Sequence, residues 1–147
     1  NTNWAGLLSK DPSYVIQCDF SYMIGNPMFK EFVLETLRTD TQKLHNTIYH
    51  LDGIGQLAHL DMLLSLPKLK AIQWVPGDGK PGPETWGDVY EKIRAAGKKV
   101  MIINDARYNG SLQFRDMLGS SLYTGVWAGA AEREEVVRYL NAMGIDV

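Results

Sequence analysis

The chain alternates between short, β-rich apolar runs and stretches in which apolar residues recur every three or four positions. The first pattern predicts strands and the second predicts amphipathic helices that pack against them. Strands are expected at residues 14–20, 47–52, 71–75, 99–104 and 121–127, and helices near residues 26–37, 57–64, 89–96, 111–118 and 132–143. The pattern therefore predicts five successive βα units.

Strict alternation with short connections predicts right-handed crossovers and a parallel sheet, and hence an α/β fold. Residues 1–13 show no such period and are expected to form an irregular lead-in to a single domain that covers residues 1–147. Parallel sheets of this kind occur in open doubly wound folds and in (β/α)8 barrels of the TIM type. The periodicity leaves both architectures open.

In either architecture, ligands bind where the strands end and the βα loops begin. The predicted strand ends carry polar residues and one tryptophan, namely Gln17, Asp19, His50, Asp52, Gln73, Asn104 and Trp127. His50 and Asp52 lie two apart on one strand, so both side chains point to the same face and can reach one metal ion or substrate. The structural alternative is a strand-end histidine that hydrogen-bonds a turn-forming aspartate.

Asp19 follows an apolar run and is a candidate catalytic acid or base, although it is equally suited to cap the turn that follows it. Cys18 precedes Asp19 in the predicted strand, so its side chain would point to the opposite face, and it is expected to be a structural thiol. Residues 76–83 form a loop rich in glycine and proline, in which Lys80 suits an active-site lid or a solvated loop. Its prolines remove the amide donors that a phosphate-binding loop requires.

Composition narrows the choice of partners. A formal net charge of −2 with interspersed signs gives no broad attraction to nucleic acid or to anionic lipid. No apolar stretch approaches the roughly 20 residues of a membrane helix. Because Cys18 is the only cysteine and no charged-then-apolar leader opens the chain, a cytoplasmic location is expected.

Residues 18–24 (CDFSYMI) and 26–34 (NPMFKEFVL) resemble a segment of the uroporphyrinogen decarboxylase family, in which a strand ending in aspartate leads into a helix with a PEMF-x-x-F-V-L-P pattern. Residues 47–53 and 71–74 are similar to the next two strands. The resemblance implies the last five units of an eight-unit barrel, a small-molecule substrate, and self-association through exposed strand edges. It implies catalytic roles for Asp19, His50 and Asp52, and substrate contacts by Gln17, Tyr22, Gln73, Asn104 and Trp127.

Related cobamide methyltransferases carry a His-x-Cys-Gly motif that binds a zinc ion, where this chain reads His50-Leu51-Asp52-Gly53. The resemblance therefore implies zinc held by His50 and Asp52, a corrinoid protein partner and methyl transfer. One alternative is decarboxylation of a tetrapyrrole. The other is a non-catalytic binding or scaffold barrel, because residues 125–130 (GVWAGA) hold neither the late histidine of the decarboxylases nor the late cysteine of the methyltransferases.

Overall fold

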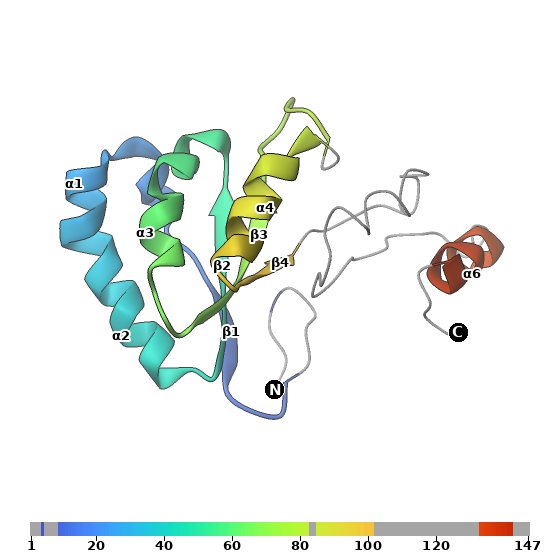
Figure 1. The fold of residues 1–147 in the computed structure, drawn as a ribbon, viewed down its shortest axis with the longest axis horizontal. Coiled ribbons are helices and arrows are strands. Elements are labelled where there is room, and N and C mark those ends of the chain that lie inside the picture. Colours follow the sequence, from blue (N-terminus) through green and yellow to red (C-terminus); the bar gives the residue numbers. More distant parts are fainter. Residues whose placement is uncertain (1–3, 5–8, 83–84, 102–132, 143–147) are drawn as a thin grey trace.

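A computed structural model describes Trp4 and residues 9–82, 85–101 and 133–142 of the chain (Figure 1). In chain order, the elements are β1 (Ser13–Ile16), the 3-10 helix η1 (Asp19–Met23), α1 (Asn26–Met28), the π-helix η2 (Phe29–Leu34), α2 (Glu35–Lys43), β2 (Asn46–Asp52), the 3-10 helix η3 (Ile54–His59), α3 (Leu60–Leu64), β3 (Leu69–Val75), α4 (Gly87–Ala95), β4 (Lys99–Met101) and α6 (Arg133–Ala142).

The strands form one four-stranded parallel sheet in the order β1-β2-β3-β4. Each strand pairs with the next one along the chain, and Val15 lies beside Ile48, which lies beside Ala71. The predicted parallel α/β architecture is thus confirmed for the described part of the chain. Of the fifth predicted unit, helix 111–118 and strand 121–127 lie outside the described residues, whereas α6 matches the predicted helix 132–143.

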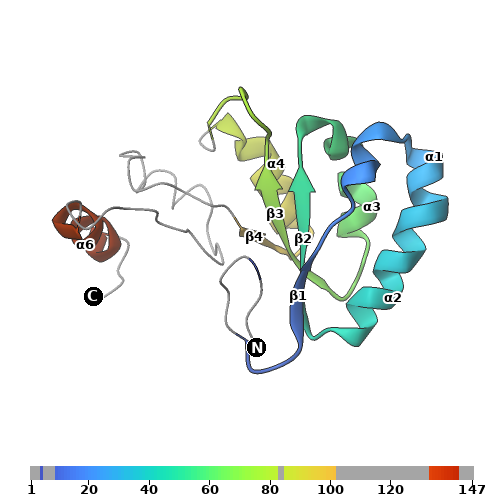
Figure 2. The ribbon, with the colours of Figure 1, turned by 180° about the vertical axis from the view of Figure 1, so that it is seen from behind.

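The helices that connect the strands gather on one face of the sheet. α3 and α4 lie in front of β2 and β3 in Figure 1 and behind them in Figure 2. Apolar side chains of alternate strand positions fill the space between the two layers, including Tyr49, Leu51 and Ile72. A second buried cluster lies on the other face of the sheet and consists of Val15, Ile48, Ala71 and Met101. Burial of both faces explains why the strands read as nearly continuous apolar runs.

The first strand ends at Ile16 instead of extending to residue 20. Ser21 is fully buried, and both its amide and its hydroxyl donate to the carbonyl oxygen of Cys18. These bonds close the 3-10 turn η1 directly after the strand. Asp19 therefore opens a helical turn, with no side-chain capping bond at Cys18, and does not end a strand.

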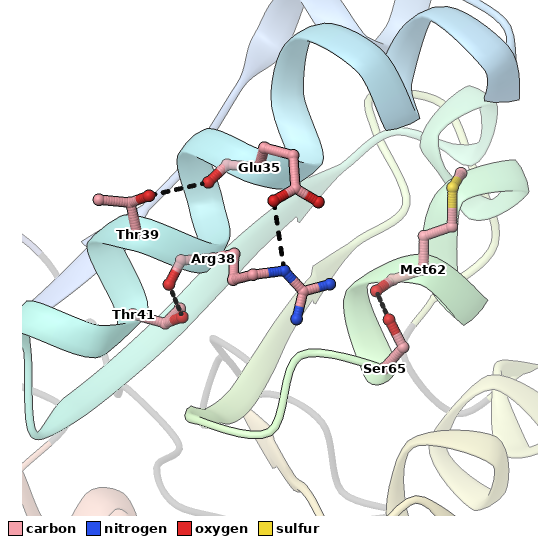
Figure 3. Close-up of polar contacts among 6 residues, drawn as sticks. All are labelled: Glu35, Arg38, Thr39, Thr41, Met62 and Ser65. Atoms are coloured by element: carbon pink, nitrogen blue, oxygen red, sulfur yellow. Dashed lines mark hydrogen bonds and ion pairs between the residues drawn. The ribbon is translucent and has the colours of Figure 1, made fainter.

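The helix predicted near residues 26–37 runs through α1, η2 and α2 as far as Lys43. Its last turns carry two threonines whose hydroxyls bond back to the helix, Thr39 to the carbonyl of Glu35 at 3.1 Å and Thr41 to that of Arg38 at 3.0 Å (Figure 3). Glu35 and Arg38 form an exposed ion pair at 3.5 Å. Because the threonine hydroxyls bond within the helix, these residues are compatible with it despite their modest helix propensity.

Lys98 lies just before β4 and is not a solvated turn residue. The Lys98 side chain is buried, and Nζ donates to the carbonyl oxygens of Leu66 at 2.7 Å and Leu69 at 2.8 Å. Burial, and to a lesser degree the charge of Lys70, lowers the pKa of Lys98 below its ordinary value. The lysine thus fastens the turn that leads into β3.

Within the described residues, none of the helices combines the length and the apolar character needed to cross a membrane.

Candidate functional site

A cavity of about 350 Å³ lies at the carboxyl ends of the central strands, where three βα loops meet. This volume falls within the roughly 300–1,000 Å³ typical of small-molecule sites. The lining residues come from the loops after β1, β2 and β3 and are Asp19, Tyr22, Asp52, Gly53, Ile54, Gln56, Pro76, Gly77, Asp78 and Lys80. The predicted lid loop therefore contributes Asp78 and Lys80 to the same cavity as the two candidate aspartates.

Two glycines after β2, Gly53 and Gly55, lie against the ring of Tyr22, which lines this cavity. Gly53 adopts a positive φ of 85°, which L side chains rarely adopt, and its amide donates to the carbonyl of Val75 at 2.8 Å. A Cβ atom on Gly55 would lie 2.8 Å from the Tyr22 ring. The ring of Tyr22 therefore packs directly on the backbone that follows Asp52.

His50 and Gln73 are register partners on β2 and β3. The Nδ1–H of His50 donates to the Oε1 of Gln73 at 2.6 Å, and the Nε2 of His50 lies 3.6 Å from the Oδ2 of Asp52. The His50 side chain is 15% exposed and that of Asp52 is 47% exposed. In a neutral imidazole this arrangement leaves the lone pair on Nε2, on the side that faces the carboxylate.

Trp4 also contacts this histidine, which the sequence pattern did not predict. Its ring meets the His50 ring edge to face, with 5.3 Å between the centroids and 89° between the planes. The indole Nε1–H donates to the carbonyl of Val15 at 3.3 Å. A lone tryptophan in an aperiodic segment gives no local signal of its partner, because the contact depends on the tertiary fold.

His50 and Asp52 fit two positions of a zinc site. Bonds of about 2.0–2.2 Å at a tetrahedral angle hold two ligand atoms roughly 3.4 Å apart, close to the 3.6 Å between Nε2 and Oδ2. Metal-binding histidines usually donate their second N–H to an oxygen acceptor, as His50 does to Gln73. Among the described residues, however, no group of three or more His, Cys, Asp or Glu side chains is placed to hold a metal ion.

The structure brings together several of the predicted site residues. His50 contacts both Gln73 and Asp52, while Asp19 and Tyr22 join Asp52 in the cavity. Gln17 donates to the Oδ2 of Asp19 at 3.5 Å but does not line the cavity. Cys18 is half-buried and packs against the main hydrophobic core. Asn104 and Trp127 lie outside the described residues.

A buried polar cluster behind the cavity was not predicted. The Tyr49 hydroxyl donates to the Oε1 of Gln56 at 3.3 Å and lies 3.3 Å from the hydroxyl of Ser21. Burial raises the pKa of Tyr49 to about 12, partly offset by its bond to Ser21. The cluster ties the loop after β1 to the loop after β2. An isolated tyrosine in an apolar strand resembles an ordinary core residue, so the sequence gives no signal of this role.

His59 takes no part in the cavity. It lies at the end of η3, and both ring nitrogens contact oxygen atoms. Nδ1 lies 2.7 Å from the Oδ1 of Asn26, and Nε2 lies 2.9 Å from the carbonyl oxygen of Ser21. Its ring stacks on Phe29 with 4.2 Å between the centroids. These contacts identify His59 as a structural residue that packs the two loops together.

Comparisons of the chain with protein-family models, with curated proteins and with solved structures found no match in any of the three.

Proposed function

We propose that the chain carries the zinc site of a methyl-transferring enzyme of the uroporphyrinogen decarboxylase-like superfamily, with His50 and Asp52 as two of the ligands. One observation carries this proposal. Gln73 holds the Nδ1 of His50 at 2.6 Å, and the Nε2 of the same ring faces the Oδ2 of Asp52 at 3.6 Å. A ring held in this way presents Nε2 to a ligand at little further entropic cost.

The order of the strands supports a barrel type of winding. A doubly wound sheet reverses its strand order at a switch point and carries helices on both faces. In the described part of this chain the order is sequential, and the helices that connect β1 to β4 lie on one face of the sheet (Figure 2). The same pattern runs around a (β/α)8 barrel, where the site lies at the carboxyl ends of the strands.

The cavity beside His50 suits a small methyl acceptor. Asp52 belongs both to the histidine pair and to the cavity lining, so an acceptor bound in the cavity would lie next to the proposed metal position. Zinc bound there would favour the deprotonated form of a thiol or hydroxyl acceptor. Asp19 would receive the proton that the acceptor releases, and Tyr22 would pack against the acceptor. A methyl-Co(III) corrinoid on a partner protein would supply the methyl group as its Co–C bond breaks, and the corrinoid would leave as Co(I).

Decarboxylation of a tetrapyrrole is less well supported. Such a substrate carries several carboxylates, which need several cationic contacts. Among the described residues that line the cavity, Lys80 is the only basic one, and it lies beside Asp19, Asp52 and Asp78. An acidic cavity of this size repels a polycarboxylate.

Zinc titration tests the proposed site. The chain and two variants, His50→Ala and His45→Ala, would compete for zinc with a chromophoric chelator. His45 is an exposed histidine outside the cavity and serves as the matched control. The proposal expects one zinc ion per chain, with affinity at least about 100-fold weaker in His50→Ala and unchanged in His45→Ala. Equal affinity in all three proteins would refute it.

A transfer assay tests the proposed reaction. Methylcobalamin and a small thiol would be incubated with the zinc-loaded chain, and the formation of methyl thioether would be followed. The proposal expects thioether formation that falls at least about 100-fold in His50→Ala. Zinc binding without any transfer would leave the metal site in place and refute the methyl-transfer assignment for this chain.

Metal-free proton transfer at His50 is a second candidate, favoured by the absence of a third ligand among the described residues. In this case Gln73 fixes the tautomer, Asp52 stabilises the protonated ring, and Nε2 accepts the proton. The zinc titration separates the two candidates, because only the zinc proposal expects His50-dependent metal binding.

A further inference from the structure

The turn that follows β3 lies directly against the backbone that follows Asp52. A Cβ atom on Gly77 would lie 3.7 Å from the Cα of Gly53, and the amide of Lys80 donates to the carbonyl of Gly77 at 3.3 Å. This close approach and this backbone bond hold the turn at the cavity of about 350 Å³, whose lining includes Asp78 and Lys80. Two charged side chains of the turn therefore line the same cavity as Asp52.

One oxygen of the Asp78 carboxylate is engaged by its own turn, and the other is available. Its Oδ1 accepts the amide hydrogen of Gly79 at 3.0 Å, which fixes the orientation of the carboxylate. No ion pair among the described residues includes Asp78. Its Oδ2 is thus free to bind a molecule that enters the cavity.

Negative charge dominates the cavity. The charged side chains in its described lining are Asp19, Asp52, Asp78 and Lys80, so three carboxylates share the space with one ammonium group. Because Lys80 can neutralise only one carboxylate, the others favour a bound cation. In the described part of the chain, no group of three or more His, Cys, Asp or Glu side chains is placed to hold a metal ion. An organic cation, which can meet the carboxylates one at a time, suits this arrangement better.

The rest of the wall also suits an organic molecule. Tyr22 and Ile54 line the cavity and are 53% and 38% exposed. Apolar and aromatic side chains around a few charged groups are typical of small-molecule sites. The face of an aromatic ring also attracts an ammonium group. The ring of Tyr22 therefore offers a second contact to the cation that the carboxylates favour.

Gln56 supplies an observation that is independent of the charges. Its side chain is 1% exposed, yet it lines the cavity. Its Oε1 accepts from the hydroxyl of Tyr49 at 3.3 Å, and this is its only side-chain hydrogen bond among the described residues. The amide donor at Nε2 is thus left without a partner, which is costly for a buried group. An acceptor oxygen on a bound molecule would satisfy it.

We propose that the cavity binds a small organic cation of the amino alcohol class. Its ammonium group pairs with Asp78 and Asp19 and contacts the ring of Tyr22, and its hydroxyl oxygen accepts from the Nε2 of Gln56. The inference rests on the proposed function only in that this molecule would there be the methyl acceptor. The binding itself requires neither zinc nor methyl transfer.

Four small probes of similar length test this ligand class by NMR titration of the zinc-free full chain, namely aminopropanol, propanediol, hydroxypropionate and butylamine. Aminopropanol is expected to bind at least about tenfold more tightly than propanediol or hydroxypropionate, which lack the positive charge. It is expected to bind about two- to tenfold more tightly than butylamine, which lacks the hydroxyl. Equal affinity for aminopropanol and propanediol, or no binding of any probe, would overturn the proposal. Butylamine that bound as tightly as aminopropanol would refute the amino alcohol class.

Asp78→Asn tests the contact with the ammonium group. Asparagine keeps the side-chain oxygen that accepts from Gly79 and removes only the charge, so the turn is retained. Asp11→Asn is the matched control, because Asp11 is exposed and does not line the cavity. Asp78→Asn is expected to weaken aminopropanol binding at least about fivefold and to leave propanediol binding unchanged. Aminopropanol affinities that were equal in the two variants would contradict the proposed contact.

These titrations fail or succeed separately from the zinc experiments. A chain that binds zinc and transfers a methyl group but has no affinity for aminopropanol would overturn this inference alone. A chain that binds the probes in the expected order but binds no zinc would support the inference and refute the proposed metal site.

Discussion

His50 and Gln73 face each other across the β2–β3 ladder, with the Nδ1 of His50 2.6 Å from the Oε1 of Gln73. Gln73 is fully buried, and its Nε2 has no hydrogen-bond partner among the described residues. A buried amide with one unpaired donor lowers stability. Its second effect is to hold the imidazole of His50 beside Asp52 through the bond at Nδ1.

Replacement of Gln73 by leucine separates these two effects. Loss of the acceptor frees the His50 ring, so zinc affinity is expected to fall about 10- to 100-fold. The free energy of unfolding should change by less than about 1 kcal/mol, because the unpaired donor disappears together with the bond. Chelator competition and urea unfolding measure the two quantities. Unchanged zinc affinity would show that Gln73 does not orient the ligand.

The pKa of Tyr49 predicts a loss of stability at high pH. The folded-state pKa of about 12 lies above the ordinary value of 10.0. Between these two pH values, the folded chain therefore binds more protons than the unfolded chain. The stabilisation is complete below pH 10 and is lost as the pH rises to 12, on the order of 3 kcal/mol in all.

Tyr49→Phe tests this assignment by urea unfolding across the same pH range. The variant is expected to lose about 1–2 kcal/mol at neutral pH, because the hydroxyl bonds to Ser21 and Gln56 disappear. It should also lack the contribution of Tyr49 to the fall in stability above pH 10. A variant whose stability falls as steeply as that of the wild type would place the titrating group elsewhere.

Lys98 has the opposite dependence on pH. Its folded-state pKa lies below the ordinary value of 10.5, so the unfolded chain binds more protons in the window between the two values. Stability from this group therefore rises as the pH approaches 10.5 from below.

Lys98→Met should abolish that rise. At neutral pH the variant is expected to lose about 1–3 kcal/mol, because the carbonyls of Leu66 and Leu69 lose their buried donor. Lys99→Met alters an exposed neighbour and should leave the unfolding midpoint unchanged. If the two variants were equally stable, the buried lysine would have no role in fastening the turn.

Gly53→Ala is expected to destabilise the chain by about 1–3 kcal/mol, because the positive φ of 85° is unfavourable for alanine. The new Cβ would also meet the Tyr22 ring at 2.8 Å and displace it from the cavity wall. Gly25→Ala is the control, because its φ is −82° and the nearest atom lies 3.8 Å away. Thermal unfolding compares the two, and equal midpoints would contradict the prediction.

The sequence predicted the order and direction of the described strands, because apolar runs and helical spacing reflect burial directly. It also placed His50 and Asp52 together, since residues two apart on a strand share a face. The end of β1 at Ile16 was not predicted, because the apolar, β-rich run continues to residue 20 and hides the 3-10 turn that Ser21 closes on the carbonyl of Cys18. The contact between Trp4 and His50 likewise depends on tertiary structure.

Zinc-edge X-ray absorption of the zinc-loaded chain tests the central claim most directly, because it reports the ligand atoms themselves. The account predicts nitrogen and oxygen ligands at about 2.0–2.2 Å with an imidazole signature that disappears in His50→Ala. A sulfur ligand at about 2.3 Å, or an imidazole signature that persists in His50→Ala, would contradict the assignment of His50 and Asp52 as zinc ligands.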